Sequence, residues 1–148
     1  MEVNSVQDEN FTDIVAFCMD GAEAEFSLKV EEGKKYRLAV ALSDISFGSE
    51  KYNESFLASL REKLKSQEAS SAQFVIWPLP KNVLSSDDDA LEMTAAFKHL
   101  ARRLKDCDNV TGFAIPRSFL DLEHAAELTE NFVHELAEKH PDYVFFRS

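Results

Sequence analysis

Basic and hydroxyl side chains follow three of the predicted strands in this 148-residue sequence. Open α/β sheets bind ligands beyond the carboxyl ends of their strands, where helices also begin. We therefore predict a small-anion site for a phosphate or a carboxylate at that edge of the sheet. Its candidate residues are Ser46, Ser49, Lys81, Asn82, Arg117 and Ser118. In the alternative interpretation, the serines only cap helices and the basic side chains stay in water.

Glycine usage limits the ligands that this edge could bind. Loops that cradle phosphates contain several glycines, as in GxGxxG or GxxxxGK[ST], because the backbone must approach the ligand closely. The sequence has four glycines and neither motif. We therefore predict no dinucleotide, no Walker-type nucleotide site and no cofactor.

Other reactive residues do not form a recognisable catalytic or metal motif. The carboxylates of Asp87, Asp88 and Asp89 point in different directions from a first helical turn, where they complement the helix dipole. Cys18 and Cys107 are interpreted as small buried hydrophobic residues, and no GxSxG motif is present. The sequence therefore predicts no metal site and no catalytic residue, which favours a protein that is not an enzyme.

The first third of the chain has the pattern of a β-sheet. Residues 13–47 contain three runs rich in β-branched and aromatic residues, separated by turn signals at Asp20-Gly21 and at 31–34. Between residues 24 and 31, apolar and polar residues alternate with a period of two. These patterns predict an antiparallel meander of three strands.

The rest of the chain alternates helices with strands. Apolar residues recur at helical spacing in residues 52–64, 91–104 and 122–137, and short apolar runs lie at 74–77, 110–115 and 143–146. Ser86 with Asp89, and Ser118 with Asp121, have the spacing of capping boxes at helix starts. The order β-β-β-α-β-α-β-α-β predicts an α/β protein, a three-layer α/β/α sandwich with a mixed sheet. We expect one domain over residues 13–148, preceded by a flexible arm at 1–12.

The charge balance excludes nucleic acid as a partner. Acidic residues outnumber basic ones by 27 to 16, and a net charge of -11 repels a phosphate backbone. The sequence shows no secretion signal and no apolar run long enough to span a bilayer. We therefore expect a cytoplasmic protein with no membrane partner.

The second half of the chain, from Phe74 to Phe146, resembles a macrodomain in outline, because a strand ending in proline, Phe113 to Pro116, precedes a candidate ligand loop. That resemblance implies a small-ligand domain or a minor hydrolase as the alternative function. The leading prediction is a non-enzymatic binding or regulatory domain that acts through protein–protein contacts, with an acidic surface suited to a basic partner.

Overall fold

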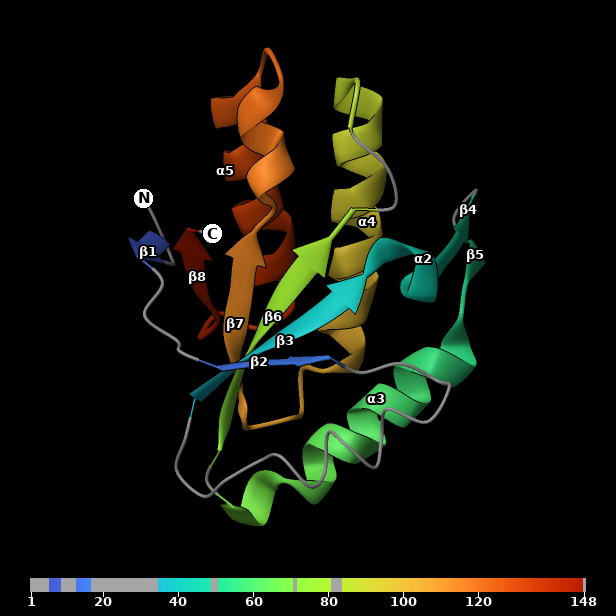
Figure 1. Ribbon diagram of the computed structural model, residues 1–148, viewed down its shortest axis with the longest axis vertical. Coiled ribbons are helices and arrows are strands. Elements are labelled where there is room, and N and C mark those ends of the chain that lie inside the picture. The colour runs from blue at the N-terminus through green and yellow to red at the C-terminus, as the bar shows by residue number, and fades with distance from the viewer. Residues whose placement is uncertain are drawn as a thin grey trace.

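A six-stranded parallel sheet forms the centre of the protein (Figure 1). The computed structural model describes residues 6–8, 13–16, 35–48, 51–70, 72–80 and 84–147. The strands lie in the order β1-β8-β7-β6-β3-β2, and each neighbouring pair is parallel. They are β1 (Val6–Asp8), β2 (Asp13–Ala16), β3 (Lys35–Ala41), β6 (Gln73–Leu79), β7 (Val110–Ile115) and β8 (Val144–Arg147).

The predicted antiparallel meander is wrong, and the pairs of the main sheet are parallel among the described strands. β2 pairs with β3 in parallel, with Asp13 beside Tyr36. Parallel neighbours need a crossover connection and not a hairpin, so β2 and β3 do not belong to an antiparallel meander. The predicted middle strand, with its alternating pattern at residues 24–31, lies outside the described residues. Antiparallel pairing in the described ranges is confined to a separate small sheet, in which β4 (Ser46–Gly48) pairs with β5 (Lys51–Tyr52).

The helices begin and end for reasons visible in the sequence. The side chain of Asn53 accepts a hydrogen bond from Phe56 N at the start of α3 (Glu54–Ser66). Ser86 caps α4 (Asp87–Arg103) as predicted, because its Oγ accepts a hydrogen bond from Asp89 N. The other shorter helices are α2 (Leu42–Ile45), η1 (Glu68–Ser70) and η2 (Arg117–Asp121).

The predicted cap at Ser118 is wrong. Residues Arg117–Asp121 form the single 3₁₀ turn η2, and α5 (Ala125–Ala137) begins only after it. Among the described helices, none has the length and apolar character needed to cross a membrane.

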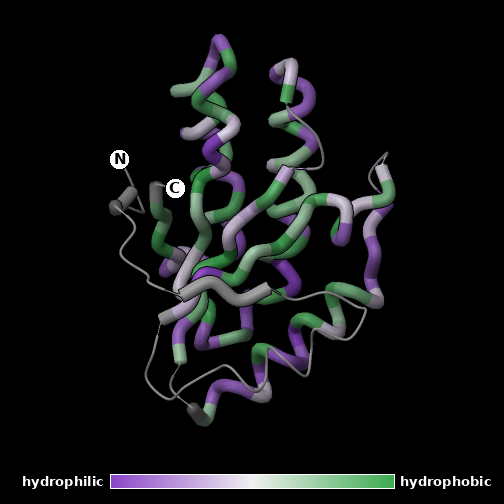
Figure 2. The backbone as a smooth tube through the Cα atoms, viewed as in Figure 1, coloured by the Kyte–Doolittle hydropathy of each residue, from purple (hydrophilic) through white to green (hydrophobic). Residues whose placement is uncertain are grey.

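The described helices cover one face of the sheet. One large buried cluster joins α3, α4 and α5 to alternate residues of the strands, and Figure 2 shows apolar residues along β3 and β7. On the strands, this cluster contains Tyr36, Leu38, Val40, Phe74, Ile76, Val110, Phe113, Ile115 and Phe145. From β2 to β8 the strands are added in one direction, and right-handed crossovers then place their helices on one face. The predicted α/β class is confirmed; a helical layer on the other face is not found among the described residues.

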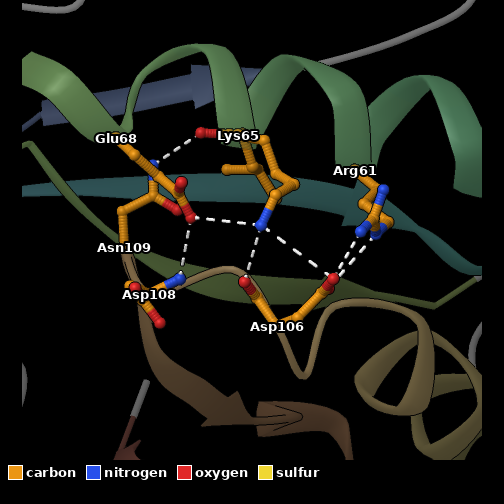
Figure 3. A network of polar contacts seen from close by, with 7 residues as sticks. Arg61, Lys65, Glu68, Asp106, Asp108 and Asn109 are labelled. Carbon is orange, nitrogen blue, oxygen red and sulfur yellow. Dashed lines mark hydrogen bonds and ion pairs between the residues drawn. The ribbon is translucent and has the colours of Figure 1, made fainter.

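A polar network fixes α3 to the loop between α4 and β7 (Figure 3). Arg61 forms a two-pronged ion pair with Asp106, which lowers the pKa of that carboxyl group, chiefly through the hydrogen bond from Arg61. Lys65 Nζ donates to the carbonyl oxygen of Asp106 at 2.8 Å. Asn109 is buried and donates from Nδ2 to Leu64 O at 2.7 Å. Exposed ion pairs contribute little to the free energy of unfolding. The buried hydrogen bond from Asn109 is therefore the main polar contact that holds this end of α3 in place.

A histidine bridge joins the amino ends of α4 and α5, and it predicts a pH effect on stability. His124 Nδ1 lies 2.7 Å from Asp87 Oδ2, and this contact raises the pKa of the imidazole, first through the hydrogen bond and then through charge. A raised pKa in the folded protein means that the stabilisation is complete below the unfolded pKa of about 6.5 and is lost as pH rises through the folded pKa.

We expect His124→Gln to lower the urea midpoint at about pH 5 and to change it less at about pH 8.5. The difference should shrink in high salt because both groups are exposed. A variant whose midpoint deficit is the same at both pH values would contradict the bridge.

Candidate functional site

A pocket of about 450 Å³ lies at the carboxyl ends of β6 and β7. Its volume is in the range of small-molecule sites. It is lined by Arg37, Trp77, Pro78, Leu79, Pro80, Ala114, Ile115, Arg117, Ser118 and Asp121. The pocket therefore combines one large aromatic ring with two guanidinium groups, a hydroxyl and one carboxylate.

Trp77 and Arg37 line the pocket because side chains alternate along a strand. Phe74 and Ile76 of β6 belong to the helix-side core, whereas Trp77 packs with the small cluster on the opposite face. Arg37 lies on neighbouring β3 between the core residues Tyr36 and Leu38. Its guanidinium carbon is 5.2 Å from the centre of the Trp77 ring, a cation–π contact that holds the two side chains together.

The short helix η2 supplies the polar side of the pocket. Phe119 is fully buried and makes an edge-to-face contact with Phe132 of α5, so η2 is anchored by its central residue. Ser118 Oγ is buried and has no hydrogen-bond partner in the described part of the chain. Arg117 and Asp121, which line the same pocket, are exposed. A buried hydroxyl without a partner destabilises a protein by about 1–3 kcal/mol, so Ser118 is a position at which an added hydrogen-bonding group would be stabilising.

Two of the six predicted site residues, Arg117 and Ser118, line this pocket. Ser46 lies in the small β4–β5 sheet, where its Oγ accepts a hydrogen bond from Gly48 N at 3.0 Å, and it is not a lining residue. Ser49, Lys81 and Asn82 lie outside the described residues. Arg37 and Trp77 are not among the predicted residues, because they lie within strands and the prediction rests on the loops that follow strands. The signal that could have found them is their odd-numbered position on strands whose even-numbered residues form the core.

Among the described residues, the lining of this pocket contains no cysteine and no histidine. Cys107 is buried, and loss of solvent raises the pKa of its thiol to about 11, so the reactive thiolate is scarce. His134, Glu135 and Glu138 cluster at the carboxyl end of α5, and none of them lines the pocket. Glu135 of that cluster accepts a hydrogen bond from Lys98 at 2.7 Å, so one potential metal ligand is already held by a cation.

The position of the pocket agrees with the topology. From β2 to β8, parallel strands follow one another in chain order and the described helices lie on one face, which is the arrangement of successive units in a (β/α)-barrel. β1 departs from it, because it pairs with β8 at the far edge. Barrel enzymes build their sites at the carboxyl ends of the strands, and this pocket lies at that end.

Comparison with solved structures finds the same fold in glycoside hydrolases. The chain matches GH5_18 from Streptomyces cattleya in complex with GlcNAc with a TM-score of 0.70 at 12% sequence identity, over 97% of this chain and 45% of that one. It matches a GH5_18 from Bifidobacterium longum subsp. infantis with a TM-score of 0.61 at 10% identity, over 97% and 44%. The chain thus spans less than half the length of these proteins. No family model matches, and no curated protein does.

These matches correct the function expected from the sequence. A third structure, GH5_18 from Bifidobacterium longum subsp. longum ATCC 55813, matches with a TM-score of 0.51 at 10% identity, over 83% of this chain and 36% of that one. All three structures are of GH5_18 proteins, which contradicts the prediction of a non-enzymatic domain acting through protein–protein contacts. The fold of the chain matches these structures, and this match corrects the resemblance to a macrodomain that the second half of the sequence suggests.

Proposed function

We propose that this protein binds a carbohydrate in the pocket at the carboxyl ends of β6 and β7. The observation that carries the proposal is that one pocket of suitable size is lined by both the Trp77 ring and the buried Ser118 hydroxyl, which has no hydrogen-bond partner among the described residues. The C–H face of a sugar ring packs on an aromatic ring, while its hydroxyls need hydrogen-bonding groups at the ring edge. The fold shared with the GH5_18 structures, one of them in complex with GlcNAc, supports the same ligand class.

The proposal concerns binding and not hydrolysis. Glycosidases use a pair of carboxyl groups, about 5 Å apart in retaining enzymes and wider in inverting ones. Among the described lining residues of the pocket, Asp121 alone has a carboxylate. The contacts present in this part of the chain therefore suit recognition of a sugar ring.

The single tryptophan of the sequence makes the test specific. Excitation selective for tryptophan reports on Trp77 alone, so a sugar that packs on this ring changes the emission without interference from another indole. We expect GlcNAc, glucose or mannose to give a saturable change. If none of these sugars changes the emission, and none stabilises the protein against heat, the proposal is wrong.

Ser118→Ala separates ligand binding from folding. Removing a buried hydroxyl that has no protein partner should leave the unfolding midpoint equal or slightly higher. The same change should weaken sugar binding about fivefold, the value of one hydrogen bond of about 1 kcal/mol. Ser55→Ala, at an exposed position of α3 outside the pocket, is the matched control and should leave the affinity unchanged. Equal affinities of Ser118→Ala and wild type would remove Ser118 from the site.

A further inference from the structure

The pocket has the opposite sign of charge to the protein as a whole. The chain has a net charge of -11, yet the lining of the pocket contains two arginines, Arg37 and Arg117, and one carboxylate, Asp121. A local excess of positive groups attracts anions to a cleft even when the rest of the protein is acidic.

Arg117 is the guanidinium best placed to contact a ligand. Its side chain is exposed at the pocket and has no ion pair in the described ranges, although Asp121 lies on the same short helix. An arginine presents parallel N–H groups that match the two oxygens of a carboxylate. Arg37 lies against the Trp77 ring, so a sugar packed at this ring is also close to a second guanidinium.

We propose that the preferred ligand is an acidic sugar, a hexuronic acid whose carboxylate binds Arg117 while its ring packs at Trp77. This inference rests on the proposed function and adds the class of sugar to it. A hexuronic acid has a carboxylate at one end of the ring and hydroxyls around the remainder. Arg117 then contacts the anionic end, and Ser118 and Asp121 contact hydroxyls.

The test compares glucuronate with glucose, which have the same ring and differ at C6. Titrations followed by Trp77 emission should show glucuronate binding about tenfold more tightly at low salt, the effect of one charge-assisted contact. The preference should decrease as salt is added, because the pocket is open to solvent. Arg117→Gln should bring the two affinities to within about twofold of each other, and Arg117→Lys should restore part of the preference.

Arg102→Gln is the matched control. Arg102 is an exposed arginine in the last turn of α4 and lines a different groove, between α4 and α5. Its loss removes the same charge from the protein and should leave the glucuronate preference intact.

Each other result of the titrations has a separate meaning. Equal affinity for glucose and glucuronate in the wild-type protein overturns the acidic-sugar inference and leaves the proposed function standing. Failure of both sugars to bind overturns the proposed function as well. Acetate binding as tightly as glucuronate identifies a plain anion site, and this also overturns the inference.

Discussion

Gly112→Ala should destabilise the protein by about 3 kcal/mol or more, a large part of the stability of an ordinary domain. Gly112 lies in β7 directly beside Val144 of β8. A Cβ at this position would lie 1.7 Å from the carbonyl oxygen of Val144 and 2.7 Å from two further backbone atoms. Because backbone atoms of a paired strand cannot turn away as a flexible side chain can, β7 and β8 would have to separate. Urea unfolding of the variant measures the loss directly.

Gly48 is the control for the general effect of replacing a glycine. Its φ of 95° lies in the left-handed region, but a Cβ there meets nothing within 4 Å. Gly48→Ala should therefore destabilise by only about 1 kcal/mol, the strain of an L-residue in this conformation. If Gly112→Ala were no more destabilising than Gly48→Ala, the close approach of β7 and β8 would be refuted.

Phe132→Ala should lower the free energy of unfolding by about 3–5 kcal/mol. Phe132 of α5 is fully buried and makes edge-to-face contacts with Phe119 and Phe145, with ring centres 5.8 Å and 6.4 Å apart. The truncation leaves a cavity at the junction of α5, η2 and β8, and it also removes two aromatic pairs. The measurement is the unfolding midpoint in urea.

The same variant should weaken ligand binding at a distance. Phe119 is the buried residue of η2, and the pocket residues Arg117 and Ser118 lie on that turn, so loss of the Phe132 ring loosens their support.

For the effect on stability, Phe47→Ala is the matched control. This phenylalanine is 68% exposed, so its truncation should change the free energy of unfolding by less than about 0.5 kcal/mol. Equal stability of the two variants would show that the Phe132 cluster is not a tight core.

Local patterns predicted the helices of this protein but not the direction of its strands. The period of apolar residues and the Ser86 cap act over a few residues, so α3 and α4 can be predicted from the sequence. The pairing of β2 with β3 joins residues more than 20 positions apart, and no local signal distinguishes a parallel from an antiparallel partner. Turn signals between these strands therefore predict hairpins, and the parallel pairing of β2 with β3 contradicts this prediction.

The site could be predicted only in part for a related reason. Arg117 follows a strand that proline ends, so the rule about carboxyl ends of strands found it and Ser118. Trp77 and Arg37 lie within strands, and their membership of the pocket depends on which face of the sheet the helices cover. The face that the helices cover follows from the order of the strands. Local patterns in the sequence do not predict this order.

The pairing of β1 with β8 has a consequence for biosynthesis. Val6–Asp8 pairs with Phe145–Arg147, so the first described strand is hydrogen-bonded to the last, and Figure 1 shows β1 beside β8. On the ribosome, β1 emerges first but has no partner until β8 has been synthesised. The units from β2 to β7 can assemble one after another, since each strand in that run pairs with one already made. β1 therefore joins the edge of the sheet only after β8 has left the exit tunnel, later than the pairing of β2 with β3.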